Sequence, residues 1–127
     1  MCSDLRILYQ NVRGIRTKVN ATYRSILNDN FDVIIFTETW LNSNINTNEF
    51  IDDRYVVYRR DRESSSSTKC DGGGVLIAVL NKIKSYRMIA WETIYEDLWV
   101  NLVIGSATIS ICAVYISHHP LILKNLR

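Results

Sequence analysis

Two short apolar runs with an amphipathic segment between them constrain the fold of this chain most. Residues 5–12 and 31–36 are each bounded by polar residues and have the length of buried strands. Residues 18–28 predict a helix, because apolar side chains recur there at three- and four-residue spacings (Val19, Tyr23, Ile26 and Leu27). Strand, helix and strand in this order predict a parallel pair joined by a crossover, with the helix covering one face of the sheet.

The rest of the chain predicts strands separated by turns. Residues 42–48 and 64–69 are polar connectors, and the glycines at 72–74 precede the second of the further strands. Because these strands follow one another without helices between them, we expect antiparallel pairing. One helix against about seven strands predicts a mixed sheet that needs cover on its other face. The further strands are expected at residues 55–58, 75–80, 86–90, 98–104 and 108–116.

Length and composition predict one folded domain over residues 1–127. With 47% hydrophobic and 22% charged residues the chain can build a core, which excludes disorder throughout. It has no signal-peptide pattern and no apolar run near the roughly 18 residues of a membrane span. The three cysteines Cys2, Cys70 and Cys112 are odd in number and widely spaced, which predicts reduced thiols. We expect an intracellular protein, with the nucleus as one candidate compartment.

Asn11 and Glu38 are the first candidates for chemistry. Each follows the end of one of the two predicted parallel strands, where ligands of α/β sheets collect. An amide oxygen and a carboxylate are hard ligands that suit Mg²⁺. Spacing alone favours a structural role instead, with Asn11 in a turn and Glu38 as a loop acid or a helix cap.

The densest basic cluster is Arg59, Arg60 and Arg62. Arginine is well matched to phosphate, so these residues are candidate contacts to a DNA backbone. The alternative is a solvated strand end, ion-paired with Asp61 and Glu63. A net charge of +2 neither demands nor excludes a nucleic-acid partner.

Five motifs follow one another along the chain. Together they resemble the endonuclease/exonuclease/phosphatase superfamily, and most closely the endonuclease domains of non-LTR retrotransposons. The motifs are Gln10-Asn11-Val12-Arg13-Gly14, Phe36-Thr37-Glu38-Thr39-Trp40-Leu41, Tyr58-Arg59-Arg60-Asp61-Arg62, Gly72-Gly73-Gly74-Val75-Leu76-Ile77-Ala78-Val79 and Ala113-Val114-Tyr115.

The resemblance implies a metal-dependent hydrolase of DNA phosphodiesters. Glu38 then matches the metal-binding glutamate, Asn11 the asparagine near metal and phosphate, and Tyr115 the tyrosine that approaches the scissile phosphate. The implied cofactor is Mg²⁺ or Mn²⁺, and relatives carry a reverse transcriptase domain on the same polypeptide. Tyr115 could equally be an ordinary tyrosine at a strand end. A phosphatase of the same superfamily and a non-catalytic retroelement-derived fragment are the alternative functions.

The implied fold is a four-layer α/β/β/α sandwich of the DNase I-like type, of which this chain would be about the first half. The family's later motifs, Gly-Asp-x-Asn and Ser-Asp-His, do not occur in the sequence. We therefore expect a partial domain that lacks the general-base half of the site and whose own hydrolysis is absent or impaired. His118 and His119 are expected in a loop, and Glu96 and Asp97 are predicted to be solvated turn acids.

Overall fold

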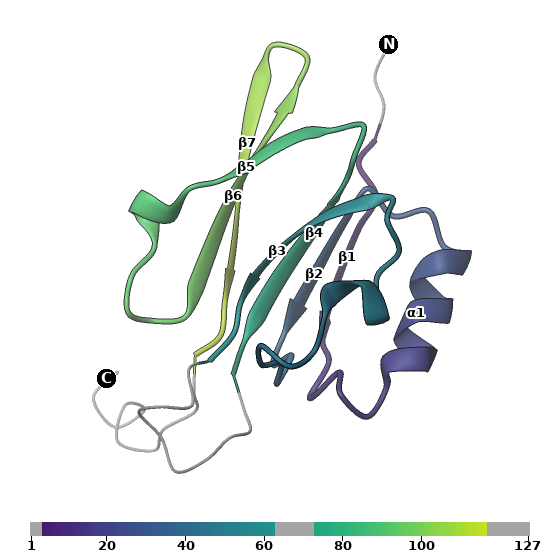
Figure 1. Ribbon diagram of the computed structural model, residues 1–127. Coiled ribbons are helices and arrows are strands. Elements are labelled where there is room, and N and C mark those ends of the chain that lie inside the picture. Colours follow the sequence, from purple (N-terminus) through teal and green to yellow (C-terminus); the bar gives the residue numbers. More distant parts are fainter. Residues whose placement is uncertain (1–3, 63–72, 117–127) are drawn as a thin grey trace, which may run out of the picture.

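Two β-sheets and one α-helix make up the part of the chain that the structure, a computed structural model, describes: residues 4–62 and 73–116 (Figure 1). None of the helices there is long and apolar enough to cross a membrane. The elements are β1 (Ile7–Asn11), α1 (Val19–Asn28), β2 (Val33–Thr37), η1 (Thr47–Glu49), β3 (Tyr55–Arg60), β4 (Val75–Leu80), β5 (Lys84–Arg87), η3 (Ile89–Trp91), β6 (Asp97–Ile104) and β7 (Ala107–Val114).

The four-stranded sheet has the strand order β1-β2-β4-β3. The predicted parallel pair is confirmed, since β1 and β2 run parallel with Asn11 opposite Thr37. The other pairings, β2 with β4 and β3 with β4, are antiparallel, as expected for the later strands. Helix α1 crosses between β1 and β2 and covers one face, where its Ile26 is buried with Ile34 and Phe36.

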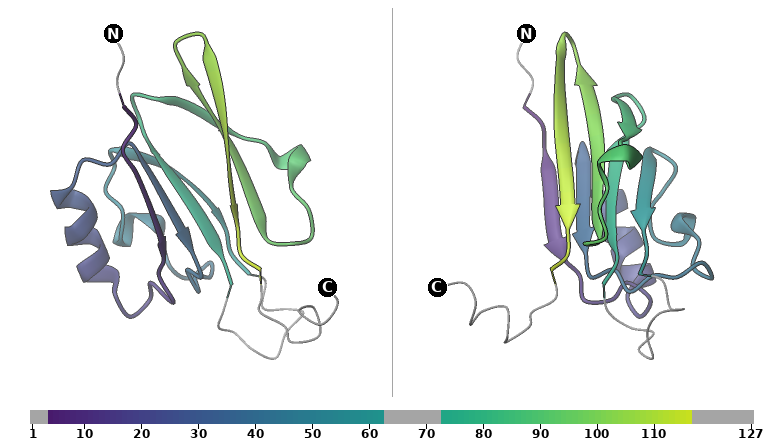
Figure 2. Two further views of the ribbon diagram at one scale, coloured as in Figure 1. Left: turned by 180° about the vertical axis from the view of Figure 1, so that it is seen from behind. Right: turned by 90° about the vertical axis from the view of Figure 1, so that its left-hand side faces the viewer.

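The three-stranded antiparallel sheet, β5-β6-β7, packs on the opposite face of the first sheet (Figures 1 and 2). Strand β4 shows how one apolar run serves both sides. Val75, Ile77 and Val79 join the core between the two sheets, while Leu76 and Ala78 join the core beneath the helix. The described residues thus form three layers, and the fourth layer of the expected sandwich stays a prediction.

Three sequence predictions need correction. The strand expected at residues 86–90 is β5 at Lys84–Arg87, because the chain turns into η3 once Met88 N–H has bonded to Trp99 O (2.8 Å). The strand expected to reach residue 116 ends at Val114, opposite the first residue of β6. Leu27 is 49% exposed, because it lies at the flank of the helical stripe that Ile26 fills. The predicted connector at 64–69, together with Gly72, His118 and His119, lies outside the described residues.

The central position of β4 yields a stability prediction. Ile77 is fully buried between the sheets, so Ile77→Ala should lower the free energy of unfolding by about 2–5 kcal/mol through lost burial and a residual cavity. Ile109→Ala, at a β7 position that is 40% exposed, is the matched control and should cost far less. Urea denaturation measures both. Equal losses would show that the core between the sheets is not packed as described.

Candidate functional site

The carboxyl ends of β1 and β2 bring Asn11 and Glu38 to one edge of the four-stranded sheet. Asn11 is the last residue of β1 and lies opposite Thr37, and Glu38 follows Thr37 directly. Asn11 is exposed and Glu38 is half-buried, so both side chains are accessible from solvent. The structure therefore places both predicted ligands at a common edge, as the parallel register requires.

Backbone hydrogen bonds continue beyond the strands and hold this edge together. Gly14 N–H donates to Glu38 O (2.8 Å), and Ile15 N–H donates to Thr39 O (2.9 Å). On the other side of the same loop, Thr39 and Trp40 donate to Gly74 O and Gly73 O (3.2 and 3.1 Å). The loop that carries Glu38 is therefore pinned on both sides by the loops that follow β1 and precede β4.

This edge also holds unusual backbone conformations. Within residues 4–62 and 73–116, the non-glycine residues with positive φ are Arg13 (48°), Glu38 (54°), Trp40 (56°) and Glu96 (55°). Each lies within three residues of a strand end at this edge. A left-handed residue with a side chain costs on the order of 1–3 kcal/mol, and such strain persists where the surroundings fix it, often at functional sites.

Two glycine positions allow the loops to approach this closely. Gly14 has φ of +95°, and a Cβ there would collide with the ring of Trp40. Gly73 has φ of +70°, and a Cβ there would collide with the Glu96 carboxylate and the Arg62 guanidinium. Gly14 therefore needs the missing side chain as well as the backbone freedom of glycine, while at Gly73 the positive φ is the main requirement, because the two charged side chains could shift.

Arg62, Glu96 and Tyr115 form a cluster beside Gly73 and Gly74, which we call the glycine loop. Arg62 donates to Glu96 through Nη2 (2.8 Å) and Nε (3.3 Å), and its guanidinium lies 5.7 Å from the centre of the Tyr115 ring. Gly74 N–H also donates to the Glu96 carboxylate (3.3 Å). The hydrogen bond to Glu96 raises the pKa of Arg62, and the charges of Glu96, Tyr115 and Glu38 add to this rise. Arg62 thus holds Glu96 by hydrogen bonds and lies over the ring of Tyr115.

The prediction that Glu96 and Asp97 are solvated turn acids is wrong for Asp97, which is only 7% exposed. Its carboxylate accepts hydrogen bonds from Thr93 N–H (2.8 Å), Thr93 Oγ1 (3.2 Å), Trp99 Nε1 (3.1 Å) and Arg60 Nη1 (2.9 Å). Burial favours a higher pKa for Asp97, but the hydrogen bonds from Thr93 and Trp99 hold it below its ordinary value of 3.8. Glu96 is half-buried, in its pair with Arg62.

The three arginines of the basic cluster have different partners. All five N–H donors of Arg59 are engaged, two with Asp61 and three with acceptors of residues 42–47. Arg60 binds Asp97 and Thr93 O, which ties β3 to β6. The ion-paired alternative therefore holds for Arg59 with Asp61, while Arg60 and Arg62 pair with Asp97 and Glu96 instead. Glu63, the other partner proposed from sequence, lies outside the described residues. Arg62 is the member of the cluster that contacts a predicted site residue.

The donors at the edge suit a hard divalent cation. Within the described residues no three His, Cys, Asp or Glu side chains gather in a metal-binding group. Mg²⁺ does not need such a cage, since it commonly takes one or two protein oxygens and keeps several waters. Glu38 with Asn11 would provide that minimal set at an accessible position.

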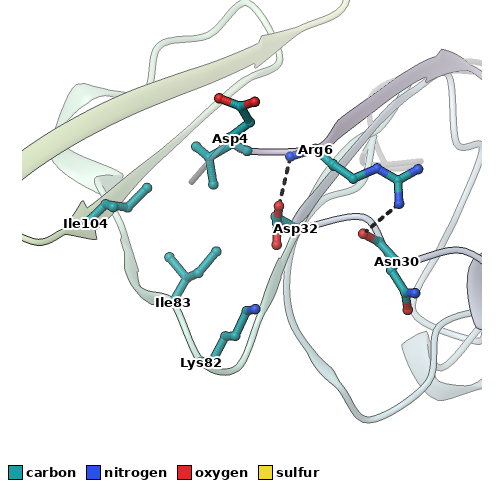
Figure 3. Close-up of a pocket in the computed structure, with 8 residues that line it drawn as sticks. Asp4, Arg6, Asn30, Asp32, Lys82, Ile83 and Ile104 are labelled. Carbon is teal, nitrogen blue, oxygen red and sulfur yellow. Dashed lines mark hydrogen bonds between the residues drawn. The ribbon is translucent and has the colours of Figure 1, made fainter. Parts of the chain in front are cut away.

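A cavity of about 350 Å³ opens at the opposite end of the sheets (Figure 3). In it, Arg6 N–H donates to Asp32 (2.8 Å) and Arg6 Nη1 donates to Asn30 O (3.3 Å). Since Asp32 precedes β2 and Ile104 ends β6, the cavity is separated from the candidate edge by the length of the strands. Its lining residues are Asp4, Leu5, Arg6, Asn30, Asp32, Lys82, Ile83 and Ile104.

Comparison with solved structures finds a similar fold in the endonuclease domain of TRAS1, a telomere-specific non-LTR retrotransposon. The TM-score is 0.58 at 11% sequence identity, and the match covers 95% of this chain and 49% of that chain. This chain thus spans about half the length of the domain that it resembles. No family model and no curated protein sequence matches it. At this identity the likeness shows a shared fold.

The buried carboxylate of Asp97 yields a pH prediction. Because its folded-state pKa lies below the ordinary 3.8, ionised Asp97 stabilises the fold above that pH, and the contribution is lost as the pH falls through the folded-state value. We expect Asp97→Asn to lower the free energy of unfolding by about 2 kcal/mol at pH 7, because it removes the mostly buried negative charge that pairs with Arg60. The difference in free energy of unfolding between wild type and variant should be smaller at pH 3, as measured by urea denaturation. An unchanged gap would contradict this role.

Proposed function

We propose that this chain is part of a metal-dependent endonuclease domain that hydrolyses DNA phosphodiesters, of the non-LTR retrotransposon type. The observation that carries the proposal is the shared edge at which the parallel β1–β2 register sets Asn11 and Glu38. Arg62 lies over the ring of Tyr115, and its partner Glu96 accepts a hydrogen bond from Gly74 N–H beside this edge. The fold shared with the endonuclease domain of TRAS1 supports the same assignment.

Each residue of the edge has a role in this proposal. Glu38 and Asn11 would hold Mg²⁺ or Mn²⁺, which when bound supplies a positive charge that polarises a phosphoryl oxygen. The Tyr115 hydroxyl would donate a hydrogen bond to a phosphate oxygen. Arg62, held by Glu96, would add positive charge beside that oxygen and steady the Tyr115 ring. The pinned loops keep these groups in place before substrate arrives, which lowers the cost of ordering them.

The described residues leave the general base unassigned. Neither histidine lies among them, and the aspartates at the ends of β3 and β6, Asp61 and Asp97, are both paired with arginine. An acid held in such a pair is a poor acceptor for the proton of an attacking water. We therefore propose that hydrolysis by this chain alone is slow, and that it contributes the metal-binding half of a larger site.

The partners follow from the same resemblance. We propose duplex DNA as the substrate and a reverse transcriptase domain on the same polypeptide as the functional companion. An intracellular location, with access to the nucleus, would suit both. The superfamily also contains phosphatases, but no observation on these residues favours a phosphomonoester over DNA.

Plasmid nicking tests the site. The assay uses Mg²⁺ and a large excess of protein, and measures the rate at which supercoiled plasmid becomes open-circular. In Glu38→Gln this rate should fall about a hundredfold or more, as when an electrostatic stabiliser of a transition state is removed. Asn11→Ala should also lower the rate. Glu49→Gln is the matched control, since Glu49 is exposed and its capping hydrogen bond to Asn46 can be kept by glutamine.

Other outcomes would decide against the proposal in specific ways. Nicking that neither Glu38→Gln nor Asn11→Ala affects would refute the site assignment. Turnover of phosphomonoesters without DNA nicking would favour the phosphatase alternative. Salt-sensitive DNA binding without hydrolysis in any divalent metal would indicate a non-catalytic domain.

A further inference from the structure

Residues 88–96, which connect β5 to β6, expose an unusual amount of apolar surface. Ile94 is 85% exposed, Tyr95 70%, Ile89 68% and Trp91 44%. Single exposed apolar residues are common, but four within seven positions concentrate exposed apolar side chains in one segment, and concentrated apolar surface often marks contact sites. We call residues 88–96 the β5–β6 loop.

The β5–β6 loop is held firmly at its base. Glu92 pairs with Arg87 (2.7 Å), and Arg60 donates to Thr93 O (2.6 Å). The ring of Trp91 meets the edge of Trp99 at a centroid distance of 5.6 Å. Thr93 N–H is fixed by Asp97, and Thr93 Oγ1 accepts a hydrogen bond from Tyr95 N–H (3.1 Å). Ile94 and Tyr95 are therefore presented to solvent by an ordered turn.

This turn adjoins the candidate edge. Tyr95 directly precedes Glu96, whose carboxylate binds Arg62 and Gly74, and whose carbonyl accepts from Tyr115 N–H (3.4 Å). In Figure 1 the loop between η3 and β6 descends to the end of the molecule at which β2 ends and β4 begins. A ligand bound along the edge would therefore meet Ile94 and Tyr95 at its side.

We propose that Ile94 and Tyr95 form an apolar contact to the bases of the DNA whose phosphate binds at the edge, an inference that rests on the proposed function. Apolar side chains that wedge between base steps, and aromatic rings that stack on bases, are recurring ways to grip DNA beside a bound backbone. A phosphate-binding surface would instead present free cations, whereas the charged groups around this loop, Arg60, Arg87, Glu92 and Asp97, are paired with one another.

Equilibrium binding without hydrolysis tests this contact. Anisotropy of a fluorescein-labelled duplex, titrated with the full chain in EDTA, reports DNA affinity even when no catalysis occurs. The double variant Ile94→Ser/Tyr95→Ser should weaken binding about 10- to 100-fold, as expected for loss of one or two base contacts. Tyr95→Phe should bind like wild type. Ile109→Ser, an apolar-to-polar change on exposed β7, is the matched control and should have no effect.

The salt dependence identifies the kind of contact. A base contact releases no counterions, so the slope of log affinity against log salt should be the same in wild type and double variant. A shallower slope, an unchanged affinity, or no DNA binding by the wild type would each overturn the inference. Self-association of the wild type that the double variant abolishes, with DNA affinity unchanged, would identify a protein contact instead. Circular dichroism and urea midpoints confirm that each variant is folded.

The design separates this inference from the proposed function. A wild type that binds DNA through Ile94 and Tyr95 but never nicks plasmid in Mg²⁺ would refute the endonuclease assignment and leave the contact standing. Nicking that depends on Glu38, with DNA affinity unchanged in the double variant, would refute the contact and leave the site standing.

Discussion

The parallel pairing of β1 with β2 is the constraint on which the rest of the structure depends. Its register places Asn11 opposite Thr37 and so sets Glu38 beside the end of β1. A parallel pair needs a crossover, and α1 supplies it while covering one face of the sheet. The pair is also buried on the other side, where Val33 packs in the core between the sheets. Shifting β2 by one residue would exchange the faces of its side chains, so the two cores and the candidate edge are fixed together.

The same pairing supports the strained backbone at that edge. Glu38 and Trp40 take left-handed conformations, separated by a fully buried Thr39. Thr39 bonds through its carbonyl to the loop after β1 and through its N–H to the glycine loop before β4. Those bonds offset the conformational free-energy cost of the two left-handed residues, which an isolated turn would avoid by changing its backbone conformation. A loop pinned in this way fixes the backbone from which the Glu38 side chain extends, as the proposed metal-binding role would require.

Sequence patterns predicted the elements of this fold better than the contacts between them. The apolar run of β4 and the periodicity of α1 are local signals, and both elements lie where these signals indicated. The pairings that define the site join residues far apart in the chain. Arg60 with Asp97 and Arg62 with Glu96 are separated by 37 and 34 positions, and no local spacing encodes them. Asp97 was therefore misjudged as solvated, although it is the buried acid that joins β3 to β6. Asn11 and Glu38 are candidates from their positions at strand ends, but their roles and that of Tyr115 come from family resemblance and stay predictions.

Strand alternation explains why neighbouring arginines differ. Side chains along β3 point in turn to the helix side and to the second sheet, so Arg59 follows Tyr55 and Val57 toward the loop at 42–47, while Arg60 follows Tyr58 toward β6. Arg62, two residues beyond Arg60, continues to the second-sheet side and meets Glu96 and Tyr115. In the described part of the chain, Arg54, Arg59, Arg60, Arg62 and Arg87 each form an ion pair with a carboxylate. These five of the chain's fifteen lysines and arginines hold loops and sheets together, and the net charge is +2. At the β5–β6 loop, where Arg60, Arg87, Glu92 and Asp97 pair with one another, a ligand would draw more of its affinity from contacts that do not depend on charge. The exposed side chains beside Glu96 are of that kind.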